Sequence, residues 1–237
     1  MSKRRGASRW ATLSANGNSD KKSFFLSWML WKEGVLLVKR KPFKCGTFED
    51  METAERYNEE TKKRMQYLSR SFVSMTKKWG IVDGEVLDIG TGTGLLAIEL
   101  AKKIPDVEVI GLDLSDVALK VARKNLREIK QPFKVSFKKG DAENTPFEAC
   151  SFDLVVSSNT LHLIKNPVRM FDEIQRVLKP SGKFFISDLR RSLLGMFSKH
   201  IRASYSPREI KEMLRRSMLQ KWKVKDYFFW LSILTKD

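Results

Sequence analysis

Residues 86–94 read VLDIGTGTG, and the helical run Leu95–Leu100 follows them at once. A short apolar strand therefore passes into three alternating glycines, and a helix is expected to begin at the third. Glycines in such a turn let bare backbone approach a bound small molecule at the N-terminus of a helix. The turn alone is compatible with several classes of nucleotide-like ligand, so the segments that follow it decide between them.

Downstream of the turn, short apolar runs alternate with helical patterns. Strands are expected over residues 85–89, 108–113, 134–137, 152–157 and 183–187, and helices over residues 93–103, 117–129 and 168–178. Such alternation predicts βαβ units and a parallel sheet of the α/β class. A basic linker, a helix over 207–219 and two strand-like runs over 222–229 and 231–235 close the chain.

Acidic residues stand where three of the expected strands end. Asp113 follows the glycines by about 20 residues, where a carboxylate can accept both hydroxyls of an unphosphorylated ribose. Asp141 ends the next strand and can accept a proton from an adenine amino group. Asp88 precedes a GxGxG run rather than the GxGxxG of dinucleotide sites, and an acid there repels a pyrophosphate but suits an amino group. These features favour S-adenosylmethionine (SAM) over a nicotinamide dinucleotide.

Five segments, taken in order, resemble the class I SAM-dependent methyltransferases. They are VLDIGTGTG, GLDLS, GDAENTPF, FDLVVSSNTLHLIKNP and VLKPSGKFFISD. Within that family the chain is similar to the small-molecule branch, which includes the ubiquinone/menaquinone-type enzymes. The resemblance implies a Rossmann-like, doubly wound, mostly parallel seven-stranded sheet with an antiparallel last strand. An N-terminal helical extension is expected before it, because residues 48–79 show an amphipathic period.

The resemblance also implies a role for each residue that matches a family motif. All of them would contact SAM: Gly90, Gly92 and Gly94 at its methionine end, Asp88 near its ammonium, Asp113 at the ribose, Leu114, Asp141 and Ala142 at the adenine, and Ser157 on the methyl-donor side. Tyr57 precedes the sheet, where similar enzymes cover the cofactor with an aromatic ring.

His162 is the candidate general base. It is one of only two histidines in the chain and follows the fourth strand. A histidine can remove a proton from a hydroxyl or thiol at neutral pH. The alternative is that His162 packs or hydrogen-bonds within its loop, and the pattern assigns no role to His200.

The net charge of +17 comes from the two flanks of the glycine-containing segment. Residues 1–44 and 189–225 each carry +9, whereas residues 45–188 are neutral. Basic flanks attract phosphate, so nucleic acid or an anionic membrane surface is a candidate partner. By composition, residues 1–23 form a disordered basic tail, residues 24–79 an extension with cap helices, and residues 80–237 the methyltransferase domain.

The number of cysteines and the hydropathy of the chain indicate its cellular compartment. The two cysteines, Cys45 and Cys150, support neither a disulfide framework nor a zinc site, so a cytoplasmic protein without a metal is expected. Residues 24–38 are the most apolar stretch, but 32–34 (KEG) interrupt it. That stretch suits a membrane interface or a covering element better than a span, and peripheral membrane contact stays an alternative.

Three functions remain open from the sequence. The first is methyl transfer from SAM to a small molecule at an undetermined O, S, N or C atom. The second is an RNA- or ribosome-directed methyltransferase that uses the basic flanks. The third is a non-catalytic SAM-binding regulatory subunit. The first is favoured because the fourth strand ends in SSNT (157–160) and not in the [DNS]PP[YF] of enzymes that methylate planar nitrogens.

Overall fold

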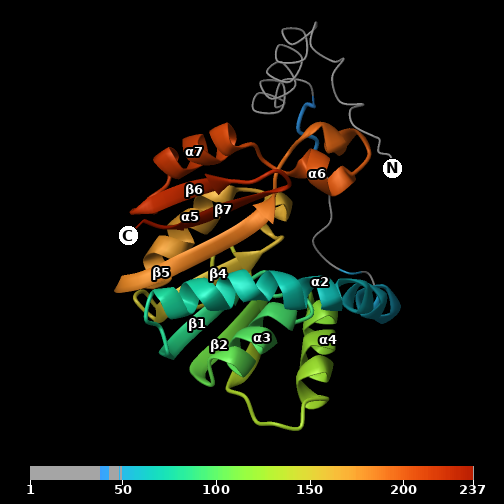
Figure 1. The fold of residues 1–237 in the computed structure, drawn as a ribbon, viewed down its shortest axis with the longest axis vertical. Helices are drawn as coiled ribbons and strands as arrows, with labels where there is room; N and C mark the ends of the chain where they lie inside the picture. The colour runs from blue at the N-terminus through green and yellow to red at the C-terminus, as the bar shows by residue number, and fades with distance from the viewer. Residues whose placement is uncertain (1–37, 43–47, 49, 237) are drawn as a thin grey trace, which may run out of the picture.

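A seven-stranded sheet forms the centre of the molecule in the computed structural model, which describes residues 38–42, 48 and 50–236 (Figure 1). Its strands are β1 (Asp83–Ile89), β2 (Asp106–Asp113), β3 (Val135–Lys139), β4 (Phe152–Ser158), β5 (Leu178–Leu189), β6 (Trp222–Asp226) and β7 (Trp230–Thr235). The spatial order is β3-β2-β1-β4-β5-β7-β6. β7 runs antiparallel to both β5 and β6, and the other paired strands are parallel. The fold expected from the sequence is thereby confirmed.

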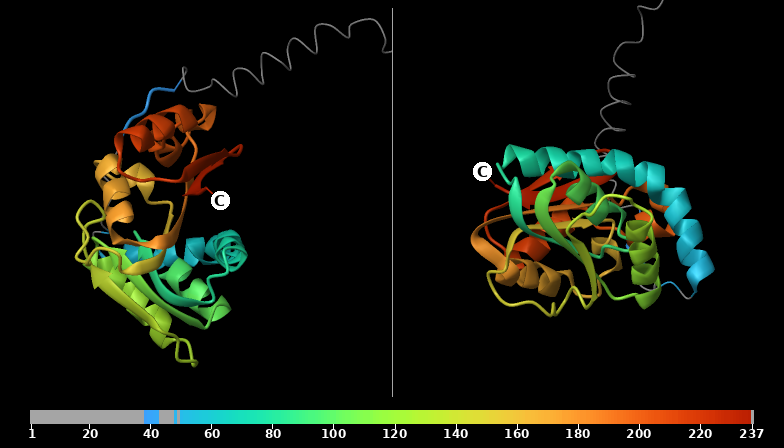
Figure 2. Two further views of the ribbon diagram at one scale, coloured as in Figure 1. Left: turned by 90° about the vertical axis from the view of Figure 1, so that its left-hand side faces the viewer. Right: turned by 90° about the horizontal axis from the view of Figure 1, so that it is seen from below.

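Helices cover both faces of the sheet (Figure 2). α2 (Met51–Lys78), α3 (Leu95–Lys103) and α4 (Asp116–Arg127) pack together on one face, whereas α5 (Pro167–Val177) and α7 (Pro207–Arg216) pack together on the other. Local sequence fixes their starts. Ser115 accepts the Ala118 N–H at the start of α4, and Ser206 forms a capping box with Glu209 at α7.

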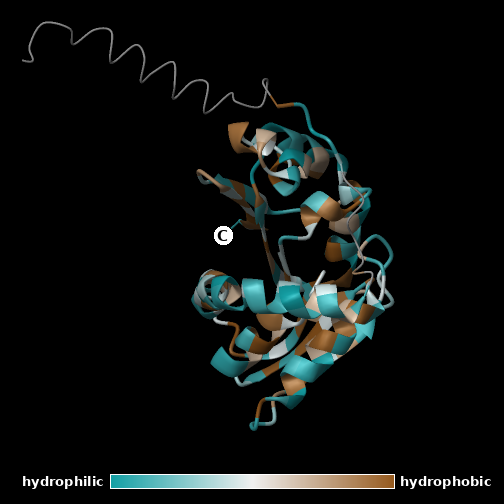
Figure 3. Cartoon of the chain, turned by 90° about the vertical axis from the view of Figure 1, so that its right-hand side faces the viewer, coloured by the Kyte–Doolittle hydropathy of each residue, from teal (hydrophilic) through white to brown (hydrophobic). Residues whose placement is uncertain are grey.

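Two apolar cores follow from the alternation of side chains along the strands. In β1, Val86 packs into the core under α3, whereas its neighbour Leu87 packs into the core under α5 and α7. Figure 3 shows the hydrophobic strands between helices whose outward faces are hydrophilic. β1 is buried from Val86 to Ile89, so the glycine turn at its end rests on a buried stretch of strand.

The structure refines two of the expected segments. A single helix, α2, occupies most of the amphipathic stretch 48–79. The basic linker after Leu189 contains η3 (Leu193–Met196) and α6 (Lys199–Ala203), which are too short to show a helical period. The predicted tail 1–23, most of the apolar stretch 24–38 and Cys45 lie outside the described residues.

No helix in the described part of the chain has the length and apolar character needed to cross a membrane.

Candidate functional site

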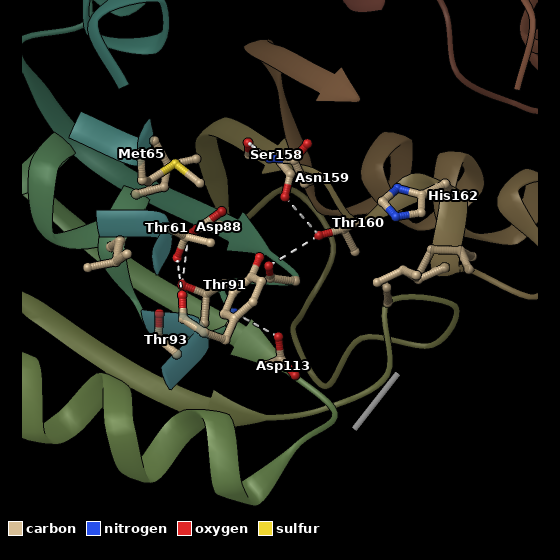
Figure 4. Close-up of a pocket in the computed structure, with 18 of the residues that line it drawn as sticks. Thr61, Met65, Asp88, Thr91, Thr93, Asp113, Ser158, Asn159, Thr160 and His162 are labelled. Atoms are coloured by element: carbon tan, nitrogen blue, oxygen red, sulfur yellow. Dashed lines mark hydrogen bonds between the residues drawn. The ribbon is translucent and has the colours of Figure 1, made fainter. Parts of the chain in front are cut away.

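A cavity of about 530 Å³ opens at the carboxyl ends of β1, β2 and β4 (Figure 4). This is the edge at which open α/β sheets bind ligands, and the volume lies in the range of small-molecule sites. α2 and α6 contribute residues to its walls from outside the sheet. The sheet therefore brings the strand-end residues together, as the sequence predicted.

The glycine turn forms one wall of the cavity through Gly90, Thr91, Gly92 and Thr93, whereas Gly94 does not line it. Gly92 has φ +55°, and a Cβ added there would meet no atom within 4 Å, so this position faces open space. Gly94 has φ +78° and starts α3, and a Cβ there would collide with the Phe137 ring at 2.6 Å. Both glycines adopt the left-handed conformation that other residues rarely take, which explains why the turn is built from glycine.

Asp113 ties the glycine turn to the end of β2. Its Oδ2 accepts the Gly92 N–H at 2.8 Å, and its Oδ1 accepts the Ser115 N–H at 2.9 Å. Burial raises the pKa of Asp113, whereas these backbone bonds oppose the rise. Each carboxylate oxygen can accept a further bond, so the fixed carboxylate can bind two hydroxyl groups in the cavity.

Asp88 is a buried carboxyl on the cavity wall, with only 1% of its surface exposed. Burial raises its pKa to about 7; the 2.7 Å bond from the Thr91 hydroxyl opposes this rise, and the charge of Asp113 adds to it. A cation in the cavity would favour the ionised form of Asp88. The position therefore suits a ligand with an ammonium group.

Beyond Asp113, the cavity wall is apolar and carries one carboxylate at its edge. Leu114 lines the cavity although 52% of its surface is exposed. Asp141 and Ala142 lie beside it, and Asp141 is oriented by the Glu143 N–H at 2.9 Å. An exposed leucine next to a carboxylate suits a flat heteroaromatic ring with an amino group at its edge.

Tyr57 reaches the cavity from α2, as the resemblance implied. Its ring lies 5.2 Å from that of Phe48, measured between centroids. α2 is held in place by Asn58, whose side chain exchanges hydrogen bonds with Asn125 of α4 at 2.8 and 3.2 Å. Asn125 also donates to the Thr93 carbonyl at 2.8 Å, so it links α2, which carries Tyr57, to the glycine turn.

Ser157 is a correction to the expected site, because it does not line the cavity. Its side chain is fully buried, and its hydroxyl donates to the Ile89 carbonyl at 2.8 Å, which joins β4 to β1. The adjacent Ser158 and Asn159 line the cavity instead. The side chains of neighbouring strand residues point to opposite faces, so a shift of one position decides which of them reaches the ligand.

His162 stands across the cavity from Asp88 and Asp113 (Figure 4). It belongs to η2 (Leu161–Leu163) and has 4% of its surface exposed. Its Nδ1 lies 2.7 Å from Asp188 Oδ1, and its Nε2 lies 3.2 Å from His200 Nδ1. Sequence reasoning did not select Asp188 or His200. Asp188 stands near the end of β5, so the rule that selected the other strand-end acids could have found it.

Comparisons with known proteins show the family of this chain. Residues 82–226 match a family model described as a methyltransferase domain. A demethylmenaquinone methyltransferase of Lactobacillus johnsonii is 38% identical over 109 residues, which are 45% of this chain and 45% of that protein. The matched region spans less than half the length of such curated relatives.

Solved structures show the same fold. A SAM-dependent methyltransferase of Methanococcus maripaludis described as putative superposes with a TM-score of 0.65 at 24% identity, over 79% of this chain and 94% of that one. A phosphoethanolamine N-methyltransferase of Haemonchus contortus, solved with SAM, gives a TM-score of 0.53 at 28% identity. It covers 61% of this chain and 35% of its own.

Proposed function

The chain belongs to the methyltransferase-domain family whose model matches residues 82–226, and from this premise we propose that it transfers a methyl group from SAM to a small-molecule acceptor. Residues 80–237 form the methyltransferase domain in this proposal. Residues 50–79 contribute the covering helix α2. The observation that carries the proposal is the carboxylate of Asp113, which two backbone N–H groups hold at the cavity edge beside the open Gly92 position.

The cavity residues fit the three chemical parts of SAM. The open backbone at Gly92 and the buried Asp88 suit the amino-acid end, whose ammonium would stabilise the ionised carboxyl. Asp113 suits the two ribose hydroxyls. Leu114 and Asp141 suit the face and the edge of the adenine ring. No other ligand class named above combines a cation, a free ribose and a purine in this order.

Bound SAM supplies a methyl group on a sulfonium that a nucleophile can attack. The chain's own contribution is alignment and exclusion of water, and alignment alone accounts for much of the rate of such transfers. Tyr57 and α2 cover the site on one side. His162, with its neighbours Asp188 and His200, provides the proton-accepting side of the cavity.

The remaining wall indicates a small acceptor with an apolar part. Leu163, Ile201 and Trp230 line the cavity beyond the glycine turn. Apolar and aromatic side chains with a few polar groups are typical of small-molecule sites. Labelled SAM should therefore transfer its methyl group to the small-molecule fraction of a cell extract. Label found in RNA would instead indicate that the acceptor is a nucleic acid, and binding of SAM without any transfer would indicate a regulatory subunit.

A matched pair of glycine variants tests the cofactor site. Gly92→Ala and Gly80→Ala both place a Cβ at positive φ, +55° and +72°, with no atom within 4 Å. Both should cost roughly 1 kcal/mol of stability. Only the Gly92 methyl enters the cavity, so only Gly92→Ala should weaken SAM binding by tenfold or more in titration calorimetry. Equal affinity of the two variants would exclude the glycine turn as the cofactor wall.

A further inference from the structure

Asp188, His162 and His200 form a continuous line of hydrogen-bonding groups, of which His162 and His200 line the cavity. They come from β5, η2 and α6. Asp188 and His162 are buried, and His200 is half-buried and lines the cavity. The chain contains two histidines, and both lie in this line. The separations are 2.7 Å from Asp188 Oδ1 to His162 Nδ1 and 3.2 Å from His162 Nε2 to His200 Nδ1.

The hydrogen bonds determine where the protons lie. Asp188 accepts the His162 backbone N–H on Oδ2 at 2.8 Å and the Leu189 N–H on Oδ1 at 2.6 Å, so it acts as an acceptor. His162 therefore carries its proton on Nδ1 and presents a lone pair on Nε2. His200 must then donate from Nδ1, which leaves the lone pair of its neutral ring on Nε2.

We propose that His200 is the general base that contacts the methyl acceptor, and that His162 and Asp188 position it and share its positive charge. This proposal rests on the function proposed above and specifies the acceptor as a hydroxyl or a thiol. The acceptor's lone pair forms the new bond to carbon, and the carbon–sulfur bond breaks with its electron pair staying on sulfur. The acceptor's proton passes to His200 Nε2, and the Nδ1 proton of His200 moves toward His162 Nε2.

The groups around His200 keep it ready to accept a proton. Burial holds the pKa of His200 below its ordinary value of 6.5, and the positive charges of Lys199 and Arg64 act in the same direction, as a protonated His162 would. Asp188 acts in the opposite direction. His200 is therefore neutral between pH 7 and 8, where the base must be unprotonated. The charge that forms during transfer is stabilised by the carboxylate of Asp188 through His162.

The short helix that carries His200 is anchored to the rest of the domain. Arg40 donates from Nε to the Ala203 carbonyl at 2.7 Å, and Ser204 donates its hydroxyl to the His200 carbonyl at 2.7 Å. At the other end of α6, the Ser198 hydroxyl accepts the Ile201 N–H at 3.4 Å. These contacts hold the His200 backbone in place.

Nuclear magnetic resonance of the full chain, with ¹⁵N-labelled histidine rings and no ligand added, tests the arrangement directly. Two histidines give two sets of ring signals, and His200→Gln assigns them. Between pH 5 and 9 we expect both neutral rings to carry their proton on Nδ1, and the His200 signals to titrate with a pKa below 6.5. A neutral His200 ring protonated on Nε2 would overturn the proposal, because that nitrogen could not act as the base.

Two further variants separate a positioning role from a structural one. Asp188→Asn removes a charge that raises the pKa of His200, so it should lower this pKa further. His162→Leu removes the Nε2 lone pair that accepts the His200 Nδ1 proton and thereby favours protonated His200, so it should also lower this pKa. A lowered His200 pKa in both folded variants supports the line of three groups, whereas a raised pKa in the His162 variant would show that His162 does not accept the His200 proton and would contradict it. An unchanged His200 pKa in either folded variant contradicts it.

Titration calorimetry with SAM distinguishes this proposal from the function on which it rests. The wild-type chain and both variants should bind SAM with affinities within about threefold of each other, because none of the three groups contacts the cofactor in the proposed site. If SAM binds and the histidine protons lie elsewhere, the base assignment fails and the proposed function stands. If the wild-type chain does not bind SAM, the proposed function itself fails.

Discussion

Asp88→Asn should make the ligand-free protein more stable at alkaline pH. The carboxyl of Asp88 has an ordinary pKa of 3.8, and burial raises it to about 7 in the folded protein. A group whose folded pKa is raised stabilises the fold fully below 3.8, and this contribution is lost as the pH rises through 7. Asparagine has nearly the same shape, carries no charge and can still accept the 2.7 Å bond from the Thr91 hydroxyl.

The size of the effect follows from the difference of about three pKa units between the two states. At about 1.36 kcal/mol per unit, ionised Asp88 costs the folded protein roughly 4 kcal/mol at pH 8. At pH 5 the folded carboxyl is protonated, and the cost falls to about 2 kcal/mol. The variant should therefore exceed the wild type in unfolding free energy by several kcal/mol at pH 8, and by less at pH 5.

Urea unfolding of both proteins at pH 5, 6, 7 and 8 measures the difference in unfolding free energy between the variant and the wild type. The titration of all other groups is the same in both proteins and cancels in this difference. A difference that grows with pH and levels off above 7 supports the assignment. A variant that is no more stable than the wild type at pH 8, or a difference independent of pH, would refute the reasoning about Asp88. The same variant should bind SAM at least tenfold more weakly, because the ammonium loses its counter-charge.

Two other substitutions have predicted outcomes. Asp113→Ala removes two charge-assisted bonds to the ribose and should weaken SAM binding by about 2 kcal/mol, roughly thirtyfold. Circular dichroism should show an intact fold, and unchanged affinity in calorimetry would exclude the ribose role. Glu173→Gln should destabilise the protein by about 1–2 kcal/mol above pH 5, because bonds from Arg176 and Thr145 hold the pKa of Glu173 at about 2. The effect is no larger because the partial exposure of Arg176 weakens the ion pair. This difference should shrink as the pH falls from 4.5 toward 2, with no change in SAM affinity; a difference that persists at pH 2 would show that the ion pair is not its cause.

The parallel sheet could be predicted because its signals are local. The strands β1, β2 and β4 contain short apolar runs, and β5 contains a similar run after the Pro180–Gly182 segment that the strand itself includes. The strand-end rule then placed Asp88, Asp113 and Asp141 at one edge, and the structure brings all three to the cavity. The antiparallel position of β7 came from the family resemblance and not from any local pattern.

The parts that sequence reasoning missed depend on contacts between distant segments. His200 lies on a five-residue helix in a basic stretch, and its partner His162 stands 38 residues earlier. Neither the helical period nor the charge pattern marks this pair. Ser157 lies away from the cavity for a simpler reason, since adjacent strand residues alternate in direction and the motif does not show which one faces the cavity.

Glu173 illustrates a third kind of omission. Its place on α5 beside Asp172 suggests a solvated helix face, yet it accepts bonds from both the backbone and the side chain of Thr145. Arg176, one turn further along α5, donates to the same carboxylate. The sequence shows the i,i+3 pair but not the loop that closes over it. This network fixes the loop that leads from Asp141 to β4.

Titration calorimetry of the wild-type chain with SAM at pH 6 and pH 8 tests the central claim most directly. The account predicts one binding site per chain and an affinity that is several-fold higher at pH 8, because Asp88 must lose a proton to pair with the ammonium. Measurements in buffers of different ionisation enthalpy should show proton release at pH 6. The absence of SAM binding at both pH values would contradict the account.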